Sequence, residues 1–271
     1  MSQGKNRASW RMGFAYAGII VGAGFSTGQE VLQFFASHGL VSILGIILAA
    51  LILMFVGRQA AKLGFRLNAE SHETPLRVLF GAKLGLVIDY VLIFFLYGIA
   101  VVMIAGSGAT FNQAFGIHPQ LGVLILILLT FGTLLLNFDK IVNIIGGITP
   151  LLIIAVVIIT GYNILNPYVP YSEVNNYVEP SRTPSSLWWF DAITYAGLAL
   201  ATAFSFLSIM GSEAQRHAIA RRGAIYGGLI IMLLMLLVNV GVLSVMPTAN
   251  EVPLPAMEMA DNMAPWLGSV Y

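Results

Sequence analysis

Long apolar segments separated by short polar ones dominate the chain. A helix needs roughly 20 apolar residues to cross the hydrocarbon core of a bilayer, and several segments approach that length. The pattern predicts an all-α, multi-pass membrane protein, because only helices or closed barrels satisfy every backbone polar group in lipid. We expect seven spans, over residues 10–37, 39–57, 84–116, 120–137, 141–165, 188–212 and 224–246, and the opening of an eighth at 265–268.

Basic residues give these spans an expected orientation. Cytoplasmic connections of membrane proteins carry an excess of Lys and Arg. If the seven spans alternate, all thirteen Lys and Arg except Arg182 lie on the side of the N-terminus. We therefore expect a protein of the bacterial plasma membrane with a cytoplasmic N-terminus. The loop over 166–187, which carries Glu173 and Glu179, is expected outside.

Composition supports a membrane protein and gives no sign of an enzyme. The chain is 58% hydrophobic and 9% charged, whereas soluble proteins carry about 25% charged residues. It has no cysteine, its four histidines lack zinc-ligand spacing, and its net charge of +1 does not suggest nucleic acid. No hydrolase elbow or phosphate loop is present. We expect no catalytic residues and no cofactor beyond a coupling ion.

A glycine-rich segment interrupts the first expected span. Each glycine costs about 1 kcal/mol of helix stability relative to alanine, so we expect the helix to unwind here. A half-helix N-terminus would suit a carboxylate, and freed carbonyls with hydroxyls would suit Na⁺, near Gly22 and Ser26. Close packing of small residues between helices is the alternative. The candidate solute-binding residues are Gly22, Ala23, Gly24, Phe25, Ser26, Thr27 and Gly28.

Glu30 is the most informative polar residue, because carboxylates inside membranes usually face a cavity or a partner. With Gln29 it is a candidate for ion coupling or gating, and an interfacial position is the alternative reading. Tyr97, near the middle of the third span, is a candidate solute contact, although simple packing explains it equally well.

Two further acidic residues are candidates for coupling or gating. Asp89 lies more than one turn into the third span, where we expect a structural ion pair with Lys83. Glu213 lies at the inner end of the sixth span, where pairing with Arg216 or Arg222 could form an inner latch. A solvated helix end explains Glu213 as well.

The first and sixth spans contain related sequences. Tyr16-Ala17-Gly18 is followed by Phe25-Ser26, and at a constant offset of 179 residues Tyr195-Ala196-Gly197 is followed by Phe204-Ser205. Chance similarity between apolar helices is the alternative. Because five spans separate the two starts, the second copy would be inverted, as in many secondary transporters. We expect a first repeat over 1–165, an outer loop over 166–187 and a partial second repeat over 188–271.

The stretch from Val21 to Glu30 (VGAGFSTGQE) resembles the YkvI-type bacterial membrane proteins. These are similar to distant members of the amino acid–polyamine–organocation superfamily, which has the LeuT-like fold. The resemblance covers essentially the whole chain. It implies discontinuous first and sixth helices and a sodium- or proton-coupled symporter. It also implies solute contacts from Gly22 to Gly28, from Tyr97, and from the sixth helix at Ala203, Phe204, Ser205 and Ser208.

Two features depart from that family pattern. The pattern has about ten helices, whereas this chain ends at the expected start of the eighth, so the sodium-site hydroxyls of helix eight are missing. The sixth span also lacks a glycine pair at its expected break. The resulting hypothesis is an alternating-access transporter of an amino acid or related carboxylate, with the lipid bilayer as its other partner. A channel-like protein and a membrane sensor or scaffold are the alternatives.

Overall fold

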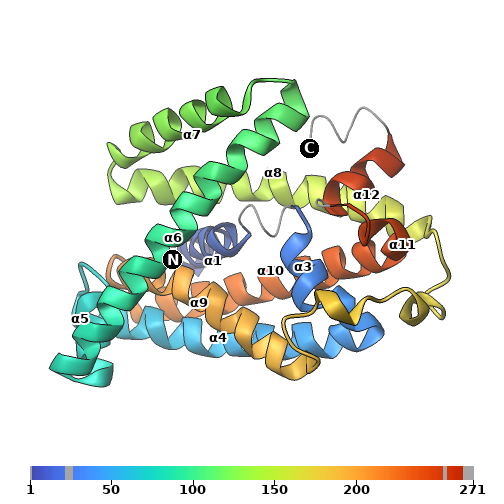
Figure 1. Cartoon of the computed structure of the whole chain (residues 1–271). Helices are drawn as coiled ribbons and strands as arrows, with labels where there is room; N and C mark the ends of the chain where they lie inside the picture. The colour runs from blue at the N-terminus through green and yellow to red at the C-terminus, as the bar shows by residue number, and fades with distance from the viewer. Residues whose placement is uncertain (1, 22–26, 253–254, 265–271) are drawn as a thin grey trace.

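The computed structural model describes residues 2–21, 27–252 and 255–264, and among these every regular element is a helix. Figure 1 shows α4, α9 and α10 lying side by side, with α8 along another side of them and α6 crossing obliquely. Five described helices are long and apolar enough to cross a membrane, which confirms the expected class. They are α4 (Ser42–Leu67), α6 (Ala82–Phe115), α8 (Phe138–Leu165), α9 (Trp188–Ser212) and α10 (His217–Ser244).

The fourth expected span is a shorter helix. Helix α7 (Pro119–Leu134) has 16 residues, or roughly 24 Å at 1.5 Å per residue, against a hydrocarbon core of about 30 Å. Gly116 separates it from α6: its φ of 66° is a left-handed conformation, and its N–H bonds the Asn112 carbonyl at 2.9 Å. Pro119 then occupies the first turn of α7, where a missing N–H costs nothing.

The described residues of the first expected span include two helices on either side of the glycine-rich segment. Helix α1 (Ser2–Ile20) ends before the glycine-rich segment, and α3 (Gln29–Phe34) begins after it. Gly28, directly before α3, has a left-handed φ of 75°. The described residues next to this segment, Val21, Thr27 and Gly28, lie outside both helices, which agrees with the expected interruption. Residues 22–26, on which most of the predicted solute contacts fall, lie outside the described residues. A short 3₁₀ helix, η1 (Ala36–Val41), then leads into α4.

The expected break in the sixth span is wrong, because α9 is one continuous α-helix from Trp188 to Ser212. Its small residues are mostly alanines, which favour a helix more than any other residue. The hydroxyls of Thr202 and Ser208 donate hydrogen bonds to carbonyls within the same helix, of Ala199 at 2.7 Å and Phe204 at 2.8 Å. These hydroxyls therefore bond within the continuous helix and do not mark a break in it.

Several polar connections contain short helices that the hydropathy pattern did not predict. Helix α5 (Glu73–Phe80) precedes α6, while η2 (Val174–Asn176) and η3 (Pro180–Arg182) lie in the loop after α8. The expected loop after the seventh span contains α11 (Met246–Ala249) and α12 (Pro255–Met263). The proposed eighth helix, over 265–268, lies outside the described residues.

Helix α12 is fixed by a buried amide. The side chain of Asn163 on α8 donates to the carbonyl of Met259 at 2.8 Å, and its oxygen accepts from Asn262 at 2.8 Å. Asn163 is fully buried, and these bonds satisfy most of its polar capacity. The polar sequence of this segment therefore folds back against α8 instead of forming an open loop.

Small residues allow close packing among α1, α4, α9 and α10. Helix α1 packs on α10, where Gly13 lies against Gly227. Helix α4 packs on α9 so closely that a Cβ added at Gly64 would meet the backbone oxygen of Ser208. Helices in lipid associate through such van der Waals packing and interhelical hydrogen bonds. Helices α4 and α10 are also joined by a buried hydrogen bond of 2.8 Å from Asn239 to the Ser42 hydroxyl.

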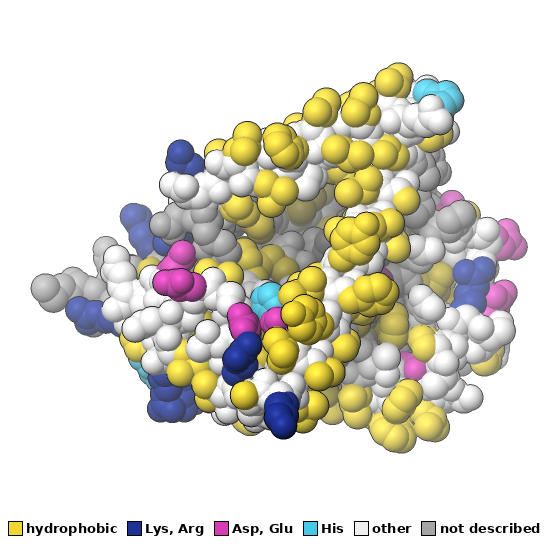
Figure 2. Space-filling model, turned by 60° about the vertical axis from the view of Figure 1, so that its left-hand side comes forward, with side chains coloured by type: hydrophobic (Ala, Val, Ile, Leu, Met, Phe, Trp, Pro, Cys, Tyr) yellow, Lys and Arg dark blue, Asp and Glu magenta, His cyan; other side chains and the backbone are white. Residues whose placement is uncertain are grey.

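Helices α6 and α7 pack on one another and leave broad apolar faces uncovered (Figures 1 and 2). Phe94 is 77% exposed and Leu134 is 70% exposed. Figure 2 shows hydrophobic side chains over the upper and middle parts of this face, whereas Lys and Arg lie mostly along its left and lower edges. Exposed apolar faces of this extent are expected of a protein whose solvent is the lipid bilayer.

Candidate functional site

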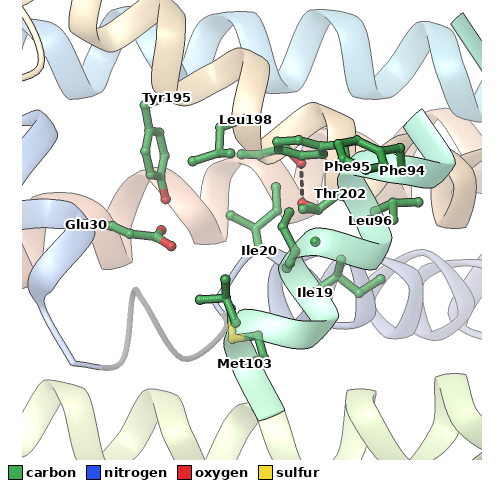
Figure 3. A pocket seen from close by; sticks show the side chains of 14 residues that line it. Ile19, Ile20, Glu30, Phe94, Phe95, Leu96, Met103, Tyr195, Leu198 and Thr202 are labelled. Atoms are coloured by element: carbon green, nitrogen blue, oxygen red, sulfur yellow. Dashed lines mark hydrogen bonds between the residues drawn. The ribbon is translucent and has the colours of Figure 1, made fainter. Parts of the chain in front are cut away.

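A pocket of about 530 Å³ lies beside the interruption of the first span. It lies between the end of α1, α3, one face of α6 and the first half of α9 (Figure 3). Glu30 is its one carboxylate among the described lining residues, and the walls are largely apolar. The lining residues are Ile19, Ile20, Glu30, Phe94, Phe95, Leu96, Gly98, Ile99, Val102, Met103, Tyr195, Leu198, Ala199 and Thr202.

Glu30 enters the pocket from the first turn of α3. Helix α12 holds the start of α3 in place, because the N–H of Ala256 on α12 donates to the Thr27 carbonyl at 2.9 Å. A Cβ at Gly28 would lie 3.2 Å from the same Ala256 nitrogen. The left-handed turn at Gly28 and its contact with α12 therefore fix the position from which the Glu30 side chain extends.

Tyr195 approaches Glu30 from α9. Its ring is 1% exposed and lies against Phe34 and Phe35, with centroid distances of 5.6 and 5.0 Å. Its hydroxyl is buried and has no hydrogen-bond partner among the described residues. Figure 3 shows this hydroxyl directed toward the Glu30 carboxylate across the pocket. The pocket thus contains a carboxylate and a hydroxyl that are free to bind a polar group.

One turn before Tyr195, a buried contact ties α9 to η1. The Nε2 atom of His38 lies 2.7 Å from Oδ2 of Asp191, and the Asp191 side chain is fully buried. Asp191 also accepts a hydrogen bond of 3.3 Å from the N–H of Ser185. This contact fixes the segment that follows α3 against the helix that carries Tyr195. Sequence reasoning missed this pair.

The sixth-span residues predicted to contact solute lie elsewhere. Ala203 is buried in the core, and Ser208 is buried against Gly64 of α4. Phe204 lines a separate pocket of about 260 Å³ between α4 and α5. The Ser205 hydroxyl is buried without a partner among the described residues. The residues of α9 that line the larger pocket lie in the two turns before Ala203. They are Tyr195, Leu198, Ala199 and Thr202.

Two other predicted residues also lie outside this pocket. Tyr97 is 69% exposed and faces away from it, although its neighbours on α6 line it. Asp89 lies 3.0 Å from Nε2 of His72, so its partner is His72 and the expected pairing with Lys83 is wrong. His72 directly precedes α5, and α5 packs on α6, which carries Asp89. Of the predicted gating residues, Gln29 is exposed and Glu30 lines the pocket.

A second pocket, of about 610 Å³, lies at another end of the helices. It brings together Arg7 and Arg11 of α1, Asn143 of α8, and Glu213 after α9. Arg11 donates to the Asn143 side chain at 3.2 Å, and Glu213 is exposed. The starts of α1, α8 and α10 and the end of α9 thus share one end of the bundle, as the alternating arrangement of spans requires.

The two tyrosines of the related sequences give a matched pair of stability predictions. Tyr16 is fully buried and donates to the Leu53 carbonyl at 3.2 Å, so Tyr16→Phe should lower the free energy of unfolding by about 1 kcal/mol. Tyr195→Phe removes a hydroxyl without a described partner and should leave the free energy unchanged or slightly higher. Thermal unfolding in detergent measures both. An equal loss in the two variants would show that Tyr195 has a structural partner.

Together these features define an α-helical membrane protein with a largely apolar pocket beside an interrupted helix. The chain is homologous to YkvI of Bacillus subtilis, described as an uncharacterized membrane protein, with 31% identity over 238 residues. The match covers 87% of this chain and 66% of that relative. A second B. subtilis relative, the uncharacterized protein YyaD, is 23% identical over 257 residues, covering 93% of this chain and 72% of its own length. No family model matches the chain, and no solved structure matches it.

Proposed function

We propose that the chain is a secondary active transporter of the bacterial plasma membrane that moves a small organic solute by alternating access. The observation that carries this proposal is the pocket of about 530 Å³ beside the interrupted first span. Ligand sites are typically concave and apolar with a few placed polar groups, and in transporters they lie where helices are interrupted. Here Glu30 and Tyr195 are those polar groups.

The packing of the helices supports an inverted repeat. Helix α1 packs on α10, α4 packs on α9, and α4 packs on α10. If α1 is exchanged with α9 and α4 with α10, this set of pairs is unchanged, as an inverted repeat requires. The two tyrosines at equivalent positions, Tyr16 and Tyr195, are both buried in this core. A LeuT-like fold is therefore part of the proposal.

The remaining parts of the hypothesis follow from charge and size. The basic end of the bundle, with Arg7 and Arg11, supports a cytoplasmic N-terminus. The pocket has room for a solute of amino-acid size, and Na⁺ or H⁺ would drive its movement. The residues 22–26 remain the predicted backbone contacts for solute and ion.

A pocket-filling substitution tests the proposal. Gly98 lines the pocket, and a Cβ there would meet nothing within 4 Å, so Gly98→Phe should fill the space without a backbone clash. We expect purified protein in liposomes to take up a solute from an amino-acid and amine panel under an H⁺ or Na⁺ gradient. Gly98→Phe should reduce this uptake by about tenfold or more, because the bulky ring occupies the binding volume.

The matched control lies two turns further along the same helix. Gly106 is also open to a Cβ but does not line the pocket, so Gly106→Phe should keep the wild-type uptake rate. Uptake that survives Gly98→Phe would refute the assignment of this pocket. Gradient-independent ion conductance, with no solute uptake, would instead favour a channel.

A further inference from the structure

The charge of the pocket restricts which solute the proposed transporter can hold, so this inference rests on that function. Among the described lining residues, the ionisable groups are Glu30 and Tyr195. The one other hydroxyl, of Thr202, already donates to the Ala199 carbonyl at 2.7 Å. Glu30 therefore dominates the electrostatics of a largely apolar volume.

The described elements around Glu30 supply no cation to pair with it. On α9, Asp191 is occupied by His38. The face of α6 that lines the pocket has no Lys, Arg or His, and Tyr97 points away. On α1, the Tyr16 hydroxyl is bonded to Leu53.

Helices α10 and α12 also pack on α3. The charged residues that α12 contributes are acidic, Glu258 and Asp261, and those of α10 lie in its first turns, at His217, Arg221 and Arg222.

A carboxylate without a cationic partner in apolar surroundings must be neutralised. Either a proton or a positively charged ligand can do this. The rings of Phe94, Phe95 and Tyr195 line the same pocket, and aromatic faces attract ammonium groups. A solute that carries only a carboxylate would be repelled by ionised Glu30. The charge pattern of these residues thus favours the amine end of a ligand over its acid end.

We propose that Glu30 binds either a proton or the ammonium group of an apolar amine, one at a time, so that the chain exchanges the two across the membrane. When the amine arrives as its ammonium ion, the protonated Glu30 carboxyl releases its proton to water and the carboxylate pairs with the ammonium. On the other side, a proton displaces the amine. Because one carboxylate cannot hold both cations, movement of the amine in one direction requires movement of a proton in the other.

Three probes that share a phenylethyl skeleton separate the contribution of the amine from that of the carboxylate. We expect 2-phenylethylamine to bind purified protein more tightly than L-phenylalanine, and 3-phenylpropionate not to bind, in titration calorimetry. In weakly buffered solution at low pH, 2-phenylethylamine binding should release a proton. Its dissociation constant should rise about tenfold for each pH unit below the range in which Glu30 ionises. In liposomes, a proton gradient should drive the amine against its own gradient.

Two substitutions test the role of the carboxylate. Glu30→Gln removes the charge at constant size and should abolish both 2-phenylethylamine binding and proton release. Glu251→Gln changes an exposed carboxylate outside the pocket and should alter neither. Thermal unfolding verifies that both variants are folded, and Glu30→Asp should retain proton release with weaker binding if the carboxyl group itself is required.

Several results would overturn this inference. Tighter binding of 3-phenylpropionate than of the amine would do so, as would amine binding that is unaffected by Glu30→Gln. If L-phenylalanine or another solute is taken up but 2-phenylethylamine neither binds nor exchanges, the amine–proton exchange fails while the transporter function stands. If no solute of the full panel is taken up under any gradient, the proposed function itself fails.

Discussion

Replacing His38 with alanine is expected to lower the free energy of unfolding by about 3–5 kcal/mol, because the change leaves a buried acidic side chain without its partner. Asp191 is fully buried, and its carboxylate lies 2.7 Å from Nε2 of His38. Without the imidazole, one carboxylate oxygen keeps only the 3.3 Å bond from the Ser185 N–H. Thermal and denaturant unfolding in detergent measure the loss.

An exposed ion pair of equal length provides the control. Arg77 and Glu73 on α5 also lie 2.7 Å apart, but their side chains are 45% and 47% exposed. Glu73→Ala should therefore cost less than about 1 kcal/mol. Adding Asp191→Asn to the His38→Ala variant should recover part of the loss, because a neutral amide replaces the unpaired charge. Equal losses for His38→Ala and Glu73→Ala would contradict the role assigned to the buried pair.

The hydropathy of the sequence predicts the membrane class and most long helices well. Segment length and apolarity determine whether a helix can cross the bilayer, so α6, α8 and α9 begin and end within three residues of their expected bounds. The interruption before α3 was also predictable, because glycines cluster there. Short polar helices such as α12 were not, since their stability depends on tertiary partners such as Asn163.

Contacts between distant residues decide the candidate site, and a single sequence does not contain them. His38 and Asp191 are 153 residues apart, and no local pattern links a histidine in one connection to an acid at the start of a later helix. Glu30 was predictable, because an acidic residue inside an apolar span is costly wherever it lies. Its partners across the pocket were not. The family resemblance placed the solute contacts of α9 from Ala203 to Ser208, and Ala203 lies about two turns from Tyr195, which lines the pocket.

The close contact between α4 and α9 depends on glycines, and a larger side chain there is expected to destabilise the protein. A Cβ at Gly64 would collide with the backbone oxygen of Ser208, and a Cβ at Gly211 with that of Ala61. Backbone cannot move aside as a flexible side chain can, so Gly64→Leu must push α9 away from α4. We expect a loss of about 3 kcal/mol or more in the free energy of unfolding, at the upper end of overpacking effects. In lipid, no hydrophobic driving force compensates for the lost packing.

Gly161→Leu is the matched control, because a Cβ at this position of α8 would meet nothing within 4 Å. It should leave stability unchanged or raise it by up to about 1 kcal/mol, since leucine favours a helix more than glycine does. Because α9 carries both Asp191 and Tyr195, Gly64→Leu should also weaken solute binding at the pocket, whereas Gly161→Leu should not. Equal melting temperatures for the two variants would show that α4 and α9 do not approach this closely in the membrane.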